Sequence, residues 1–129
     1  MLLIDAANVI GSRPTGWWRD RAGAARQFVE ELRRAARDGR LPLPAVVILE
    51  GDARAGTAET DTDGVSVVHA TYNGDDALVA QIATTGTILV TADRRLRERA
   101  RELRAETVGP SWLYARLRPS QYHEDNEKG

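Results

Sequence analysis

Short apolar runs alternate along this chain with segments of helical periodicity, and this alternation constrains the fold more than any other feature. The run at 45–49 (AVVIL) is β-branched without polar alternation, which is typical of a strand buried on both faces. The alternation predicts a three-layer α/β/α sandwich with a mainly parallel central sheet. We expect strands at 1–5, 45–49, 65–70, 87–91 and 106–108, and helices at 17–37, 75–84, 93–103 and 110–117.

The chain has 129 residues, which is enough for one domain with a full hydrophobic core. We expect this domain to span 1–118, with a mobile loop at 51–64 and a polar, flexible tail at 119–129. The absence of cysteine excludes disulfides, zinc–thiolate sites and thiol nucleophiles. The apolar runs are too short for a signal peptide or a membrane span, so we expect a cytoplasmic protein that does not contact membranes.

Four aspartates fall where the expected strands end or helices begin: Asp5, Asp75, Asp76 and Asp93. Open α/β sheets bind their ligands at the carboxyl ends of the strands, and right-handed crossovers would bring Asp5 and Asp93 face to face there. Clustered carboxylates repel one another unless a cation neutralises them, and oxygen ligands of this kind suit Mg²⁺ or Mn²⁺. The pattern predicts a metal-dependent site that cleaves phosphodiester bonds. The alternative explanation is that these aspartates are turn and cap residues.

The residues next to two of these aspartates have both a functional and a structural explanation. Asn8, three positions after Asp5, would hold the carboxylate or contact substrate, although an Asx turn at each residue explains the pair as well. Thr91 would hydrogen-bond the carboxylate of Asp93 or the attacking water, whereas Asp93 itself would also serve as a helix N-cap.

Asp75 and Asp76 open a helix, where the helix dipole stabilises carboxylates in the first turn. Adjacent helical residues point about 100° apart, so only one of the two needs to face the site. The apolar residues that follow predict a packed face that leaves Asp76 nearer the edge of the sheet, and we therefore favour Asp76 over Asp75. These apolar residues are Ala77, Leu78, Ala80 and Ile82.

Basic and aromatic residues indicate a phosphate-rich partner. Seventeen of the eighteen basic residues are arginine, which binds phosphate bidentately, although a GC-rich genome would produce the same bias. Three arginines, Arg13, Arg19 and Arg21, flank Trp17 and Trp18. Arginine beside tryptophan is suited to bind single-stranded bases and phosphates. The alternative is that Trp18 belongs to the core and Trp17 is a partly exposed lid. Six arginines within 94–104 would steer a polyanion, or form a solvated helix face with the interleaved glutamates.

Two further acids, Glu50 and Asp52, follow the second expected strand. They would support or contact the site, although solvation of a loop explains them equally well.

Three segments, LLIDAANVIGS, GDDALV and ILVTADRRLR, resemble in this order the acidic motifs of the PIN-like nuclease superfamily, and especially of its NYN-domain branch. The motifs are short, but the likeness extends over roughly 1–117. It implies a three-layer α/β fold of Rossmann-like topology and a Mg²⁺- or Mn²⁺-dependent endoribonuclease. It also implies metal ligands and supporting residues, namely Asp5, Asp76 or Asp75, and Asp93, with Asn8 and Thr91 in support.

The chain departs from the family pattern directly after Asp93. Many members carry a further aspartate there, whereas Arg94, Arg95 and Arg97 occupy this stretch. Three alternatives follow: Asp75 replaces that charge, the site holds a single metal ion, or activity is weak.

We therefore expect a ribonuclease that acts on single-stranded RNA, and the residues expected to contact substrate are Ser12, Arg13, Trp17 and Arg94. A catalytically weak RNA-binding module is one alternative, which the missing later aspartate favours. A nucleotide pyrophosphohydrolase is another, because proteins classed in this way resemble the N-terminal strand and the WWRDR segment, although their helical EExxE-type metal motifs are missing here. The sequence leaves a homodimer open and carries no signature of a protein partner such as an antitoxin.

Overall fold

The computed structural model describes residues 1–71, 74–82 and 86–118, and these form one six-stranded sheet in the order β3-β4-β2-β1-β5-β6. All neighbouring strands pair in parallel except β3 and β4, which are antiparallel. The strands are β1 (Leu2–Asp5), β2 (Ala45–Leu49), β3 (Asp61–Thr62), β4 (Val65–His69), β5 (Ile88–Val90) and β6 (Glu106–Val108).

The first strand, β1, lies in the middle of the sheet. Leu2 pairs with Ala45 of β2 on one side and with Ile88 of β5 on the other. Every residue of β1 is buried, as its unbroken apolar run requires. The expected arrangement, in which the strands at 1–5 and 87–91 end side by side, is therefore confirmed.

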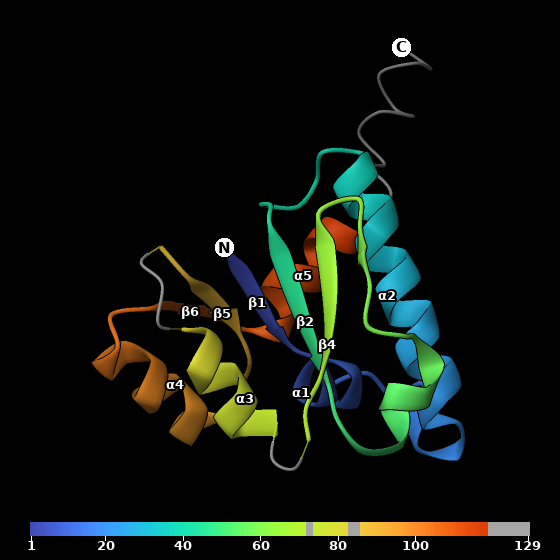
Figure 1. The fold of residues 1–129 in the computed structure, drawn as a ribbon, viewed down its shortest axis with the longest axis horizontal. Helices are drawn as coiled ribbons and strands as arrows, with labels where there is room; N and C mark the ends of the chain where they lie inside the picture. Colours follow the sequence, from blue (N-terminus) through green and yellow to red (C-terminus); the bar gives the residue numbers. More distant parts are fainter. Residues whose placement is uncertain (72–73, 83–85, 119–129) are drawn as a thin grey trace.

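Helices cover both faces of the sheet and make three layers (Figure 1). One core cluster joins Leu2 and Ile4 of β1 to the helices on one face, and a second cluster joins Leu3 to the helices on the other face. The alternation of side chains along the strand explains this division. The three-layer α/β/α prediction is confirmed. The helices are α1 (Ala6–Gly11), α2 (Arg21–Arg37) and α5 (Pro110–Leu117) on the first face, and α3 (Gly74–Gln81) and α4 (Arg94–Glu102) on the second.

Helix α2 begins later than its sequence periodicity predicts. Trp17–Arg19 form a separate 3-10 turn, and the Asp20 carboxylate then accepts a hydrogen bond from the Gly23 amide at 2.8 Å. A side-chain cap of this kind fixes the start of a helix, so α2 runs from Arg21. The expected helix start at residue 17 is wrong because the cap at Asp20 interrupts the pattern.

Several short elements differ from the expected pattern. Helix α1 follows β1 directly, and two short elements occupy 51–64 in place of the expected mobile loop: a 3-10 turn at Gly51–Gly56 and the strand β3. Strands β3 and β4 form a hairpin whose turn has positive φ at both Asp63 and Gly64, as a type I′ turn requires. The end of the helix expected at 75–84 lies partly outside the described residues, and the expected tail at 119–129 lies entirely outside them. None of the described helices is both long and apolar enough to cross a membrane.

Candidate active site

Asp5 ends the central strand at the carboxyl edge of the sheet and is only 8% exposed. Its Oδ1 accepts a hydrogen bond from the backbone N–H of Asn8 (3.4 Å), which caps α1. Its Oδ2 accepts one from the hydroxyl of Thr91 (2.9 Å), a fully buried residue directly after β5. The ends of two strands that are 86 residues apart in sequence are thus joined at one carboxylate.

The loop between β5 and α4 is held by a chain of hydrogen bonds. The side-chain oxygen of Asn8 accepts from the Ala92 amide (2.7 Å), and the Thr91 hydroxyl oxygen accepts from the Asp93 amide (3.1 Å). Asp93 in turn caps α4, because its Oδ1 accepts from the Leu96 amide at 3.0 Å. Asn8 therefore holds Asp5 through its backbone, whereas its side chain holds the opposite loop.

The carboxyl groups at this edge disfavour one another's ionisation. Burial raises the pKa of Asp5 to about 6, although the hydrogen bonds from Thr91 and Asn8 oppose the shift. The negative charges of Asp75 and Glu50 raise this pKa further. Burial and the charges of Asp93 and Asp76 likewise raise the pKa of Asp75, and the guanidinium of Arg99 partly offsets this. We call Asp5, Glu50, Asp75 and Asp93 the acidic cluster.

Of the two acids that open α3, Asp75 belongs to the acidic cluster and Asp76 points elsewhere. Asp76 has a side chain that is 71% exposed and pairs with Arg99 of α4 at 3.2 Å. Leu78 and Ile82 set the rotation of the helix because both are buried in the core. Asp75 lies three residues before Leu78, on the same side of the helix. The geometry thus favours Asp75, opposite to the preference that the sequence indicates.

Glu50 joins the end of β2 to the start of α3. Its Oε2 accepts a hydrogen bond from the Gly74 amide at 2.7 Å. A Cβ at position 74 would overlap with this carboxylate, so the contact needs glycine there. Asp52, the other acid after β2, is exposed and lines a second hollow with Trp18 and Arg19.

A cavity of about 560 Å³ lies beside the acidic cluster. We call it the Trp17 cavity. Its wall includes Glu50 and Ala6, the residue directly after Asp5, and the Arg21 guanidinium lies over the Trp17 ring, 5.3 Å from its centroid. Trp18, in contrast, is 55% exposed, so the alternative in which it belongs to the core is wrong. The complete lining is Ala6, Ala7, Ile10, Trp17, Arg21, Ala24, Glu50, Gly51 and Ala53.

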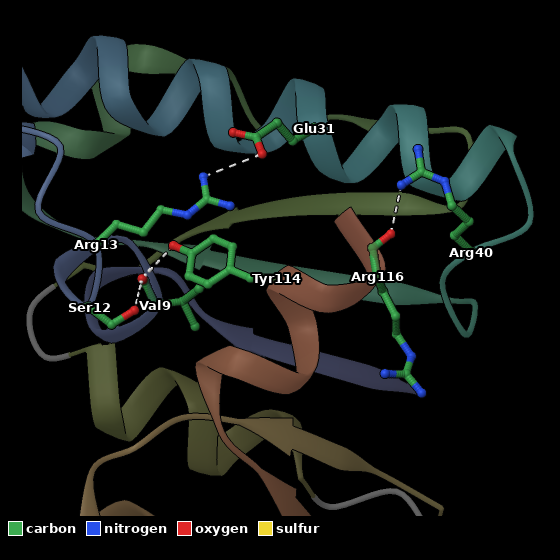
Figure 2. Close-up of polar contacts among 7 residues, drawn as sticks. All are labelled: Val9, Ser12, Arg13, Glu31, Arg40, Tyr114 and Arg116. Atoms are coloured by element: carbon green, nitrogen blue, oxygen red, sulfur yellow. Dashed lines mark hydrogen bonds and ion pairs between the residues drawn. The ribbon is translucent and has the colours of Figure 1, made fainter. Parts of the chain in front are cut away.

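Two of the expected substrate contacts, Ser12 and Arg13, are engaged within the protein (Figure 2). The Ser12 hydroxyl donates to the carbonyl of Val9 at 2.7 Å. The Arg13 guanidinium lies 3.5 Å from the centroid of the Tyr114 ring and pairs with Glu31 at 3.5 Å. These contacts tie α1 to α2 and α5, which gives both residues a structural role.

Helix α4 presents exposed arginines next to the acidic cluster. Arg94 is exposed in the first turn, and among the described residues it forms no ion pair or side-chain hydrogen bond. Arg97 turns inward instead, because its Nε donates to the carbonyl of Thr91 at 2.7 Å. Glu98 and Glu102 make no ion pair within the described part of the chain, so the salt-bridged face that they would build is not observed.

The donor chemistry of the acidic cluster fits a hard divalent cation. No group of three or more acidic or histidine side chains lies at metal-ligand spacing within 1–71, 74–82 and 86–118. Mg²⁺, however, keeps several waters and is commonly bound through one or two carboxylates together with substrate phosphates. Neighbouring carboxylates are suited to such binding: the charge of Asp75 raises the pKa of Asp5, and the charge of Asp93 raises the pKa of Asp75.

No protein-family model and no curated protein sequence matches this chain. Its structure is similar to that of a tryptophan-to-leucine mutant of Rae1 (YacP) from Bacillus subtilis, with a TM-score of 0.64. The two sequences are 16% identical, and the match covers 90% of this chain and 73% of that chain. At this identity the comparison concerns the fold, and it establishes that the two proteins share their α/β/α architecture.

Proposed function

We propose that this protein is a metal-dependent endoribonuclease that hydrolyses single-stranded RNA at the acidic cluster. The observation that carries the proposal is Asp5, a carboxyl group buried at the end of the central strand with a pKa of about 6. Burial of an acid among other acids opposes folding at neutral pH, and strongly perturbed pKa values concentrate at functional sites. The fold agrees with the one implied by the resemblance to PIN-like nucleases.

The residues of the cluster have distinct tasks in this proposal. A bound Mg²⁺ or Mn²⁺ would neutralise the charge that develops on the phosphate oxygens. Asp5, held by Thr91 and by the Asn8 amide, and Asp75 would hold that ion. Asp75 also combines a raised pKa with partial exposure, the properties needed to accept a proton from the attacking water. Asn8 and Thr91 keep the two strand ends in register.

The test is cleavage of a labelled single-stranded RNA in Mg²⁺ or Mn²⁺. We expect Asp5→Asn and Asp75→Asn each to lower the cleavage rate by about 100-fold or more, since catalytic acid–base groups commonly contribute that much. Asp76→Asn is the matched control, because Asp76 is the neighbouring acid but is exposed and pairs with Arg99. A larger loss in Asp76→Asn than in Asp75→Asn would show that the site has been placed on the wrong acid.

A catalytically weak RNA-binding module is the second candidate function. The absence of a three-ligand group among the described residues favours it, together with Arg94 and Arg95 in the stretch where many PIN-like nucleases carry a further aspartate. This candidate predicts RNA binding that persists in EDTA and no cleavage with either metal ion.

A further inference from the structure

We propose that the Trp17 cavity binds a nucleobase of the RNA next to the phosphate that is cleaved, an inference that rests on the proposed function. Its volume of about 560 Å³ falls within the range of roughly 300–1,000 Å³ that is usual for pockets that hold small organic ligands. The hollow exists because small residues meet there: Ala6 and Ala7 from α1, Ala24 from α2, and Gly51 and Ala53 from the 3-10 turn after β2.

The cavity lies next to the acidic cluster. Ala6 lines the cavity and is the residue next to Asp5. Glu50 lines the cavity as well, and its charge acts on Asp5. A base in the cavity would therefore belong to a nucleotide adjoining a phosphate at Asp5.

The chemistry of the cavity suits a base better than a purely apolar ligand. Trp17 supplies an aromatic face, and stacking on such a face accepts every base. The exposed Arg21 guanidinium beside the ring supplies the positive charge that a neighbouring phosphate would require. Trp17 is half-buried and its ring lies beside Gly11, the last residue of α1.

The adjacent tryptophan provides a matched control. Trp18 lies edge-on to Trp17, with ring centroids 5.9 Å apart, but it lines the adjoining hollow near Asp52, which shares only Arg21 with the Trp17 cavity. Arg19 lies near the Trp18 ring, as Arg21 lies near the Trp17 ring. Variants of Trp18 and Arg19 thus alter the same kinds of side chain in the same segment at two residues that do not line the cavity.

The experiment measures RNA binding separately from cleavage. Titration of a short single-stranded RNA into the full chain carrying Asp5→Asn, in EDTA, follows binding by tryptophan fluorescence and by anisotropy of the labelled RNA. We expect Trp17→Ala in this background to weaken binding by about 10- to 100-fold, the loss typical of one base–aromatic stack. Trp18→Ala should change binding by less than about 3-fold, and Trp17→Phe should restore most of the affinity.

An abasic position in the RNA tests whether Trp17 contacts a base. Removal of one base at a single position next to the cleavage site should weaken binding to the parent protein and leave binding to Trp17→Ala unchanged. Unchanged affinity in Trp17→Ala, with its fold verified by circular dichroism, would overturn the inference, even if the wild type cleaves RNA in a metal-dependent way. Loss of binding in Trp17→Ala, together with a wild type that never cleaves, would instead support the cavity and refute the nuclease function.

Discussion

Asp5 opposes folding at neutral pH through its buried charge. Its pKa is about 6 in the folded protein and 3.8 in a model peptide. Below 3.8 both folded and unfolded chains hold the proton, so the residue has no effect there. As the pH rises through 6, the folded state must ionise a carboxyl that the unfolded chain ionised already, and the destabilisation becomes complete above about 6. Each pKa unit corresponds to about 1.4 kcal/mol, so the full effect is about 3 kcal/mol at most.

We expect Asp5→Asn to raise the free energy of unfolding by about 1–3 kcal/mol at pH 8 in EDTA while it abolishes cleavage. The amide is nearly isosteric with the carboxylate and keeps hydrogen-bonding capacity toward Asn8 and Thr91. At pH 4 the increase in the free energy of unfolding should be small. Denaturant unfolding at both pH values measures it, with Asp76→Asn as a control that changes stability by less than about 0.5 kcal/mol. Equal stability of Asp5→Asn and wild type at pH 8 would contradict the raised pKa.

A cation that binds at Asp5 should stabilise the folded protein. At 100 times its dissociation constant, a ligand adds about 2.7 kcal/mol, which raises Tm by several degrees in a domain of this size. We expect Mg²⁺ or Mn²⁺ to raise the Tm of the wild type, EDTA to reverse the shift, and Asp5→Asn to lack it. An equal metal-dependent shift in the wild type and in Asp5→Asn would place the ion elsewhere.

At the scale of elements, Asp93 has two separable roles because it both caps α4 and belongs to the acidic cluster. Serine retains the cap and removes the carboxylate, whereas alanine removes both. We expect Asp93→Ala to lower the free energy of unfolding by about 1 kcal/mol and Asp93→Ser to change it by only a few tenths, while both lose cleavage. Denaturant unfolding and RNA cleavage measure the two effects. Full cleavage activity in Asp93→Ser would show that Asp93 acts only as a helix cap.

The elements that carry long apolar patterns were predictable, and the short ones were not. Strands β1, β2 and β5 fall where their apolar runs predict them, since burial in the centre of a sheet demands such runs. Helix α1 has six residues and is too short to display periodicity. Strand β3 consists of the polar Asp61 and Thr62 and forms because β4 offers it hydrogen-bond partners.

The candidate site was likewise predictable only in part. The meeting of Asp5 and Thr91 follows from topology alone, because parallel strands end at one edge of the sheet. The placement of Asp75 instead of Asp76 depends on how Leu78 and Ile82 rotate α3, and the small residues Ala77 and Ala80 leave that rotation ambiguous in sequence. The Trp17 cavity is formed by residues from separate elements, so no local sequence pattern predicts it.

At the scale of the whole molecule, a net charge of −1 conceals a strong separation of charge. The acidic cluster lies at the carboxyl edge of the sheet, and α4 adds exposed arginines beside it. Arg94, Arg95 and Arg101 are exposed and form no ion pair within the part of the chain that the structure describes. Such an arrangement attracts a polyanion to the edge of the site, whereas the acids themselves oppose its approach unless a cation is present.

This separation predicts a salt dependence that is local to α4. Arg94→Gln should weaken binding of single-stranded RNA at low salt and reduce the slope of log Kd against log salt by roughly 0.7–1, the loss of one phosphate contact. Arg34→Gln is the matched control: Arg34 is also exposed, but it lies at the carboxyl end of α2, which leads to the opposite edge of the sheet. Its slope should equal that of the wild type. RNA titrations at several salt concentrations measure both variants, and equal slopes for Arg94→Gln and Arg34→Gln would mean that α4 does not contact the RNA backbone through Arg94.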